Sequence, residues 1–409
     1  MIIRKIDKKE VIESKKLSSI CFEYPFDTKG KTDDEYLDET LDSPQSKDDA
    51  FYYEKWGAFN EQNEMMSCLS VIPYQFFFDG KWFKGTGIGN VCTYPHHRRK
   101  GAVKEIFNHI LVDMYDNNVV FSYLYPFSES FYNKFGYSRL TNSICWALNL
   151  NMIPDYRYSG TFHLYPDSSS LNDYVAAYNT YASKINMMVL RDDYDWDNLN
   201  NAKAYHNNNY AYLYKDQEGE PRGYLIFKKE IRNNEPILNC RELIFDNFDT
   251  LKAIMSFVKT YASDYRKFRF HAPIHFNLEY FCKDFSIGNS SMNIASNGMV
   301  RVIHVDEALT YATYKGSGIL TLKISDPYIL QNNQTFTVTY HNSKAIEVTT
   351  SPTDNAFDIE MPIDIFSAAI TGKYNAEDFE YMDNVSIHCS KDKVQNIFYQ
   401  KPNWINNYF

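Results

Sequence analysis

In the first part of the chain, the spacing of hydrophobic and polar positions changes from segment to segment between the spacing of a strand and that of a helix. Between about residues 102 and 117, apolar side chains recur at helical spacing, which predicts an amphipathic helix. The continuous apolar run at 119–125 predicts a buried strand after that helix. Asp79-Gly80 predicts a hairpin turn, because glycine tolerates positive φ. Further strands are expected at 2–6, 50–54, 64–73, 74–78, 87–94 and from Phe135, and further helices at 9–22 and 128–134.

The order of these elements predicts a mixed α/β fold, and a shorter version of it follows. In the second third of the chain, about 151–295, we expect a hairpin at 210–214 and 223–228, a helix at 249–264 and a strand at 268–271. Its strand-to-helix junction has no glycine-bearing turn, so a structural role is expected. In the last third, strands are expected at 300–305, 319–324, 334–340 and 345–350, and helices from Asp306 and at 363–371.

Composition limits the classes of function. The chain has 409 residues, which favours about two to four domains, and its hydrophobic fraction of 44% is enough for real cores. The formal net charge of -10 argues against a nucleic-acid binder, which needs a surface that neutralises phosphates, and fits a cationic substrate better. No run of 18 apolar residues occurs, so neither a membrane-spanning helix nor a membrane partner is expected.

The cysteine and histidine patterns indicate no metal or disulfide chemistry. The seven cysteines are scattered and include no Cys-x-x-Cys pair, so neither a disulfide framework nor a structural zinc site is expected. His96-His97 has no third ligand at a suitable spacing, and no Walker A or dinucleotide fingerprint is present. We therefore expect no metal, flavin or nicotinamide cofactor. The first residues contain no apolar signal core, and the simplest location is a reducing cytoplasm.

The segment with the clearest chemistry runs from Gly89 to Val103. There a strand leads into an Arg-x-x-Gly turn, and the amphipathic helix begins after it. Free backbone N–H groups at a helix N-terminus, together with the helix dipole, favour a pyrophosphate. Gly101 would let the backbone approach the phosphates closely, and the basic residues at 98–100 add charge. A solvated basic turn is the alternative, but the strand before and the helix after favour anion binding.

This segment resembles motif A of the GNAT superfamily of N-acetyltransferases. The version here, Tyr94-Pro-His-His-Arg-Arg-Lys-Gly101, followed by Ser128-Glu-Ser-Phe-Tyr-Asn-Lys-Phe-Gly-Tyr137, is similar to the Eis family (enhanced intracellular survival proteins). Residues 299–309 resemble the start of that family's sterol-carrier-protein-like domain, and 366–373 and 402–409 fit its helix and its terminus. The resemblance covers nearly the whole chain and is least specific in the middle third.

The resemblance implies tandem GNAT domains followed by a sterol-carrier-protein-like α+β domain, assembled as a homo-hexamer. The expected domains are an N-terminal GNAT domain at 1–150, a degenerate second GNAT-like domain at 151–297 and the sterol-carrier-like domain at 298–409. The implied co-substrate is acetyl-CoA, which backbone N–H groups would hold and polarise. Ser128 would either cap the next helix or touch the CoA arm. The other implied CoA-binding residues are Val91, Cys92, Thr93, Arg98, Arg99, Lys100, Gly101 and Ala102.

The resemblance also implies the catalytic groups. Tyr132 matches the family's general acid, which protonates the leaving thiolate, and a phenol with a pKa near ~10 suits that role. The main-chain carboxylate of Phe409 matches the general base. The acceptor would be a primary amine of an aminoglycoside, a lysine or a polyamine. Acidic and aromatic residues are implied for its pocket, namely Glu23, Tyr24, Phe26, Asp33, Asp34, Glu35 and Tyr36.

Two other classes of function remain as alternatives. A lipid- or small-ligand-binding protein would use the sterol-carrier-like third, with a large apolar tunnel within 300–409. The intact Arg-x-x-Gly turn and Tyr132 argue against that reading. A tandem-GNAT aminoacyltransferase of cell-wall synthesis would need an aminoacyl-tRNA partner, which the acidic charge disfavours, and usually a long helical arm, for which no heptad segment is found. The predicted function is therefore acetyl transfer from acetyl-CoA to an amine.

Overall fold

A computed structural model describes residues 1–44, 46–51, 54–352 and 356–407. The chain folds into two compact units. Unit 1 comprises Met1–Leu140, Gly298–Lys401 and Asn406–Phe409, and unit 2 comprises Thr141–Asn297 and Pro402–Ile405. The three domains predicted from the sequence, with boundaries after residues 150 and 297, remain a prediction, because the two compact units do not test them.

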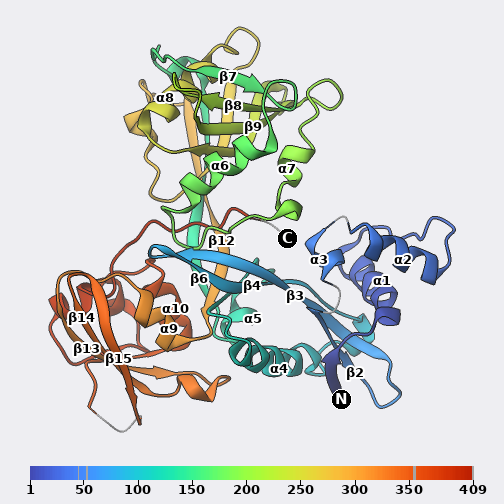
Figure 1. Ribbon diagram of the computed structural model, residues 1–409, viewed down its shortest axis with the longest axis vertical. Helices are drawn as coiled ribbons and strands as arrows, with labels where there is room; N and C mark the ends of the chain where they lie inside the picture. Colours follow the sequence, from blue (N-terminus) through green and yellow to red (C-terminus); the bar gives the residue numbers. More distant parts are fainter. Residues whose placement is uncertain (45, 52–53, 353–355, 408–409) are drawn as a thin grey trace. The chain divides into compact units, whose positions relative to one another are not determined.

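Unit 1 begins with the strands and helices that carry the predicted anion-binding turn (Figure 1). Its strands stand in the order β1-β2-β3-β4-β5-β12; β4 and β5 are parallel, and the other described neighbours are antiparallel. The strands are β1 (Ile2–Lys5), β2 (Lys55–Phe59), β3 (Met65–Phe78), β4 (Lys81–Thr93), β5 (Phe121–Leu124) and β12 (Ser290–Val302), of which residues 298–302 belong to unit 1. The helices are α1 (Val11–Phe22), α2 (Asp33–Asp42), α3 (Lys47–Ala50), α4 (Ala102–Asp116) and α5 (Glu129–Asn133).

The helices α4 and α1 cover opposite faces of this sheet. Successive strand residues point to opposite sides, so Ala58 packs with the buried face of α4 while Phe59 packs with α1. The apolar face of α4 predicted from its spacing is fully buried, with Ile106 and Phe107 both 0% exposed. This packing holds the N-terminus of α4 at the end of β4.

Two strand predictions in this region are wrong. The separate strands expected at 64–73 and 74–78 form the single strand β3, because Pro73 lies beyond the last pairing of β3 with β2 and loses no hydrogen bond on that side. Of the strand expected at 50–54, the described residues 50, 51 and 54 do not lie in a strand. Residues 47–50 are helical, because Ser46 caps α3 by accepting from the N–H of Asp49 at 3.1 Å. Residues 52–53 of that prediction lie outside the described residues.

The strands of unit 2 stand in the order β6-β11-β10-β9-β8-β7, with β10 and β11 as a parallel pair. The predicted hairpin, helix and strand are present as β8, β9, α8 and β11. The strands are β6 (Ser138–Asn149), β7 (Thr161–Leu164), β8 (Asn209–Lys215), β9 (Pro221–Arg232), β10 (Glu235–Phe245) and β11 (Lys267–Pro273). The helices are α6 (Leu171–Ala182), α7 (Asp197–Asn200) and α8 (Phe248–Lys259).

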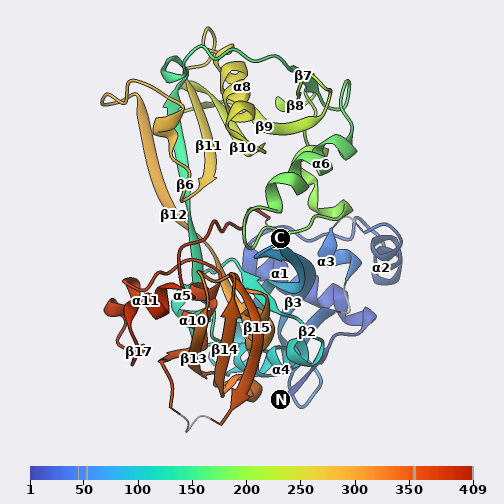
Figure 2. The same ribbon diagram turned by 60° about the vertical axis from the view of Figure 1, so that its left-hand side comes forward.

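The last part of unit 1 is a five-stranded sheet in the order β15-β14-β13-β16-β17, and Figure 2 shows β13, β14 and β15 side by side. Its interior is filled by side chains, since Leu322, Val338, Phe366 and Ile370 are all 0% exposed. The strands are β13 (Gly318–Ser325), β14 (Thr335–His341), β15 (Lys344–Ser351), β16 (Ile359–Pro362) and β17 (Ser386–Ile387). The helices are α9 (Val305–Tyr311), α10 (Ile363–Ile370) and α11 (Lys391–Gln395).

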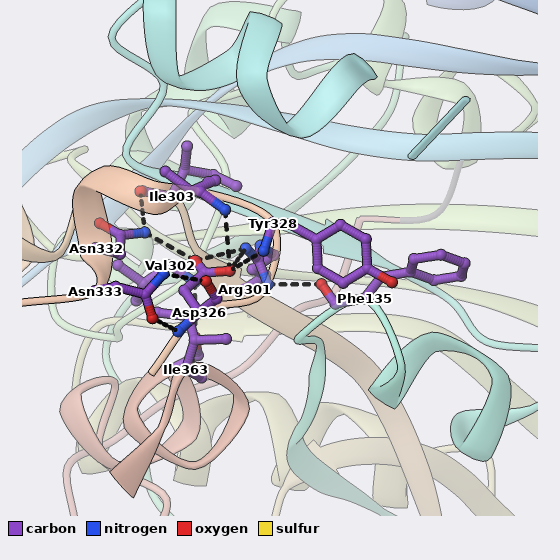
Figure 3. Close-up of polar contacts among 11 residues, drawn as sticks. Phe135, Arg301, Val302, Ile303, Asp326, Tyr328, Asn332, Asn333 and Ile363 are labelled. Atoms are coloured by element: carbon purple, nitrogen blue, oxygen red, sulfur yellow. Dashed lines mark hydrogen bonds and ion pairs between the residues drawn. The ribbon is translucent and has the colours of Figure 1, made fainter. Parts of the chain in front are cut away.

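A fully buried ion pair joins the two parts of unit 1. Arg301 in β12 donates to both carboxylate oxygens of Asp326, at 2.8 and 2.7 Å, and both side chains are 0% exposed. Arg301 also donates to the carbonyl oxygen of Phe135 at 2.6 Å, and Asp326 accepts from Asn332 at 2.9 Å (Figure 3). Gly136 has a φ of +78°, and a Cβ there would lie 1.7 Å from Arg301 Nη1. A glycine is therefore required beside the guanidinium.

Asp326→Asn is expected to lower the free energy of unfolding by about 3–5 kcal/mol, because it leaves the buried guanidinium of Arg301 without its anionic partner. Urea unfolding measures this loss. The control is Glu380→Gln, which breaks an exposed pair with Lys391 in the same unit, where 60% of the Glu380 side chain is accessible. Its expected effect is less than about 1 kcal/mol. Equal losses in the two variants would contradict a structural role for the buried pair.

Candidate active site

The parallel strands β4 and β5 part at the centre of unit 1. Their paired register ends where Ile88 stands opposite Leu124, and β5 stops there while β4 continues to Thr93. Residues 89–93 therefore have no described residue of β5 opposite them. A strand edge without a partner offers its N–H and C=O groups to another extended chain.

A β-bulge lies in the same stretch of β4. The register between β3 and β4 shifts between Cys68 and Ser70, so that Asn90 and Val91 together stand opposite one residue of β3. Asn90 has a left-handed φ of 51°. Its side-chain amide lies 3.5 Å from Ser70 Oγ, which in turn donates to Asp48. Bulges leave one residue unpaired and turn the backbone, which is why they recur beside active sites.

The turn after β4 exposes its backbone N–H groups. Arg99 and Gly101 have left-handed φ values of 64° and 83°, and Gly101 is the N-cap of the 15-residue helix α4 without a side-chain cap. Within the described residues, we find no backbone acceptor for the N–H groups of 99–104. A Cβ placed on Gly101 would meet no described atom within 4 Å. Open N–H groups and a helix dipole at a glycine cradle form an anion site.

The parted strands and the turn line one cavity of about 1090 Å³. Four basic side chains reach it, and none of the four forms an ion pair with a carboxylate of the described residues. The chain as a whole has a net charge of -10, so these four unpaired cations are a local excess of positive charge at the place where phosphates would lie. The basic residues are Arg98, Arg99, Lys104 and Lys134. The predicted CoA-binding residues that border the cavity are Val91, Cys92, Thr93, Arg98, Arg99, Gly101 and Ala102.

A smaller cavity of about 310 Å³ shares Phe22, Val91 and Phe127 with the larger one. Tyr132 of α5 borders it and is only 2% exposed. Its ring packs edge-on against Phe131 and Phe127, with centroids at 5.1 and 5.4 Å. Burial, with a smaller contribution from the Tyr137 hydroxyl, raises the pKa of the Tyr132 phenol well above its ordinary value. Tyr132 therefore keeps its proton at neutral pH.

Two predicted CoA-binding residues lie outside the lining of the larger cavity. Lys100 is exposed, and its Nζ lies 3.2 Å from Nδ1 of His97. Ser128 stands at the N-cap of α5 but makes no side-chain cap hydrogen bond. Its hydroxyl lies 3.1 Å from that of Ser130 at an exposed position. Ser128 therefore does not cap α5 through its side chain. Contact of Lys100 or Ser128 with CoA remains a prediction.

Of the predicted acceptor-pocket residues, Tyr24 borders the smaller cavity. Glu23 is exposed at the left-handed end of α1. The rings of Phe26 and Tyr36 meet edge-on at 5.6 Å and pack against the apolar cluster of α1. The acidic residues at 33–35 form the first turn of α2, where negative charge stabilises a helix N-terminus. The roles of these residues in acceptor binding stay predictions.

Sequence reasoning missed several residues of the larger cavity. Phe127 and Lys134 flank the segment that contains Tyr132, so the motif itself carried a signal for them. Lys104 follows the glycine turn by three positions, at helical spacing. Tyr328 also lines the cavity, although it lies in the last third of the chain, and no local pattern marks it.

The C-terminal segment is held at the smaller cavity. Tyr125, which borders that cavity, donates its hydroxyl to the carbonyl oxygen of Asn407 at 3.0 Å, and Asn407 is 5% exposed. Earlier in the segment, Lys401 forms a buried ion pair with Asp79 of the hairpin turn. Phe409, the predicted source of the general base, lies outside the described residues.

Unit 2 repeats the strand-helix-strand crossover, but the start of its helix is capped by a side chain. α8 connects the parallel strands β10 and β11, as α4 connects β4 and β5. The first N–H groups of α8 are taken, because the side-chain oxygen of Asn247 accepts from the N–H of Asp249 at 2.9 Å and of Thr250 at 3.0 Å. Asp246 stands beside them and accepts from Thr250 Oγ1 at 2.6 Å. Carboxylates at this helix N-terminus would repel phosphates.

The bulge of β10 is filled by a buried ion pair. The register with β9 shifts between Cys240 and Glu242, and Glu242 pairs with Arg191 at 2.7 Å, each side chain being 4% exposed. The guanidinium of Arg191 also lies over the rings of Tyr178 and Trp196, at 4.1 and 4.9 Å. A packed charge pair therefore stands at the place in unit 2 that corresponds to the open bulge of β4.

Other chemistry is not marked in the part of the chain that the structure describes. There, no group of three or more His, Cys, Asp or Glu side chains is arranged to hold a metal ion. Among the same residues, no helix combines the length and the apolar character needed to cross a membrane. All seven cysteines are free thiols.

Known protein families match the three parts of the chain. Residues 2–140 match the model of an acetyltransferase (GNAT) domain, residues 187–302 match a second acetyltransferase (GNAT) domain model, and residues 305–406 match a sterol carrier protein domain. No curated protein matches the chain. The chain thus carries two GNAT domains followed by a sterol carrier protein domain. It is an acyltransferase of the GNAT type, and GNAT domains use acyl-CoA as the donor.

Solved structures share this fold over at least 98% of their length. A GCN5-related N-acetyltransferase from Anabaena variabilis has a TM-score of 0.84 at 19% identity, covering 100% of each chain. Eis1 from Mycobacterium abscessus has a TM-score of 0.81 at 15% identity, again over 100% of each chain. A GCN5-related N-acetyltransferase from Kribbella flavida has a TM-score of 0.78 at 14% identity, over 100% of this chain and 98% of its own. The resemblance to the Eis family is thereby confirmed in domain order and fold.

Gly101→Ala is expected to weaken CoA binding by about tenfold or more, because its Cβ would enter the space through which phosphates approach the backbone. Isothermal titration with CoA measures the loss. The matched control is Gly316→Ala, whose glycine also has a positive φ of +73° and no described atom within 4 Å of the place where a Cβ would lie. Both changes strain the backbone by about 1–2 kcal/mol. If both variants bind CoA equally well, the turn is not the anion site.

Proposed function

We propose that the protein transfers the acetyl group of acetyl-CoA to a primary amine in a ternary complex, at the junction of its two cavities. The proposal rests on the observation that the two cavities share lining residues. Val91 on the bulge borders both the larger, cationic cavity and the smaller cavity that contains Tyr132. A thioester lying along β4 would have its carbonyl at this junction, within reach of an amine in the smaller cavity.

Acetyl-CoA fits the groups that line the larger cavity. The pantetheine arm would lie along residues 89–93 and hydrogen-bond with the strand edge that β5 leaves open. The pyrophosphate would accept from the N–H groups of 99–104, with Arg98 and Arg99 beside it. The N–H of Val91 would donate to the thioester carbonyl oxygen and stabilise the negative charge that develops there during attack.

Tyr132 is the proposed general acid. The amine nitrogen attacks the thioester carbon, and the carbon–sulfur bond then breaks. The sulfur leaves as a thiolate, which takes the proton of the Tyr132 hydroxyl. Burial keeps this phenol protonated before the reaction, as a general acid must be.

The main-chain carboxylate of Phe409 is the proposed general base, which takes the proton from the attacking amine. The hydrogen bond from Tyr125 to Asn407 supports this role, because it holds the chain two residues before Phe409 at the rim of the smaller cavity. The described chain therefore brings Asn407 to the cavity that Tyr125 and Tyr132 line. Two extended residues span about 7 Å.

The proposed acceptors are aminoglycosides, lysine side chains and polyamines. The acidic net charge supports cationic substrates, and the exposed ring of Tyr24 at the smaller cavity offers a cation–π contact. Seven free thiols suit a reducing cytoplasm, which we keep as the proposed location. Assembly as a homo-hexamer is proposed from the family resemblance.

Tyr132→Phe is expected to lower kcat about 100-fold or more, because it removes the proton donor while keeping the ring. Thiol release from acetyl-CoA with a panel of aminoglycosides and polyamines measures it. Tyr158→Phe is the control, since Tyr158 lies in unit 2 and is 41% exposed. Absence of acetyl transfer to any amine by the native protein would contradict the proposed function. Unchanged turnover in Tyr132→Phe would remove only the acid assignment.

A short tag added after Phe409 is expected to abolish most of the turnover, because it converts the terminal carboxylate into an amide that cannot accept the proton. The matched control carries the same tag before Met1, which is 50% exposed. CoA affinity is measured on both proteins and should equal that of the native chain. Full turnover in the C-terminally tagged protein would show that another group is the base.

A further inference from the structure

Part of the larger cavity belongs to the sterol carrier protein domain. Tyr328 lies directly after β13, in a loop of that domain, and lines the cavity. Its partly buried ring lies 5.7 Å from the ring of Phe135, which follows α5 and also lines the cavity. Phe135 in turn stacks at 4.1 Å on Phe107 in the second turn of α4. Tyr328 therefore lies beside α4, beyond the N–H groups at its start.

The side chains around Tyr328 suit a phosphorylated purine. Lys104 and Lys134 line the same cavity and form no ion pair within the described residues. An aromatic ring offers a stacking face to a base, and lysines offer point charges to a phosphate. When a pyrophosphate lies at the N-terminus of α4, the part of CoA that follows it is an adenosine that carries a 3′-phosphate. The ring and the two lysines line the same cavity as the turn before α4, so they are available to that end of CoA.

The buried ion pair fixes the position of this ring. One carboxylate oxygen of Asp326 accepts from the N–H of Tyr328 at 3.0 Å and from the N–H of Ile329 at 3.2 Å. The same carboxylate is held by Arg301, which also holds the carbonyl oxygen of Phe135 at 2.6 Å. Figure 3 shows this arrangement, with Arg301 between Asp326 and Phe135. One guanidinium thus sets the loop of Tyr328 and the backbone of Phe135 relative to each other.

We propose that Tyr328 is a CoA-binding residue supplied by the sterol carrier protein domain. Its ring stacks on the adenine, Lys104 and Lys134 pair with the 3′-phosphate, and the Arg301–Asp326 pair is the positioning device for the ring. This inference rests on the proposed acetyl-CoA site and deepens it. It gives the third domain a direct part in donor recognition.

Isothermal titration with two probes tests the proposal, namely CoA and 4′-phosphopantetheine, which lacks the nucleotide. Tyr328→Ala should bind CoA about tenfold more weakly than the native protein, as loss of one base–aromatic stack predicts. Its affinity for 4′-phosphopantetheine should be unchanged. Tyr328→Phe keeps the stacking face and should bind CoA within about twofold of native. The control Tyr381→Ala removes a ring that is 89% exposed in the same domain and should leave both affinities unchanged.

The outcomes separate this proposal from the one on which it rests. Native CoA affinity in Tyr328→Ala overturns the role of Tyr328 and leaves the acetyl-CoA site standing. An equal loss for both probes also overturns it, because that would mark a general distortion of the cavity. Failure of the native protein to bind CoA overturns both proposals. Tight CoA binding without acetyl transfer to any amine overturns only the catalytic function.

Discussion

The separation of β4 from β5 after Ile88 is the constraint on which the rest of the site depends. Parallel neighbours normally satisfy each other's backbone groups, and a strand that loses its neighbour leaves N–H and C=O groups that need new partners. β4 continues to Thr93 past the end of β5, and the chain then enters α4 through left-handed residues at Arg99 and Gly101. An extended arm that ends in a pyrophosphate matches this sequence of open groups.

The two GNAT domains show how the same crossover can be open or closed. In unit 1, the bulge of β4 borders a cavity and the helix N-terminus carries no side-chain cap. In unit 2, the ion pair of Arg191 and Glu242 stands at the bulge, and Asn247 occupies the N–H groups of α8. Buried charges need such pairing to be tolerated. The second domain thus has side chains of its own where the first has room for a ligand.

Local patterns in the sequence predicted much of unit 1 and the centre of its site. The helical spacing of α4, the hairpin at Asp79-Gly80 and the glycine turn at Gly101 each depend on a few neighbouring residues, so one sequence can reveal them. The predicted break at Pro73 was wrong. A strand tolerates a proline where no neighbouring strand needs its N–H, and which neighbours are present depends on the tertiary structure. Tyr328 was missed for the same reason, since contacts distant in the sequence, with Asp326 and Phe135, place it at the cavity.

Amide hydrogen exchange of the native protein with and without CoA tests the central claim most directly, because it reports on the backbone groups themselves. The account predicts that CoA slows exchange at residues 89–93 and 99–104, and that the corresponding strand-to-helix junction of unit 2, at 246–250, is unchanged. Protection confined to 246–250, or no protection at 99–104 at saturating CoA, would contradict it.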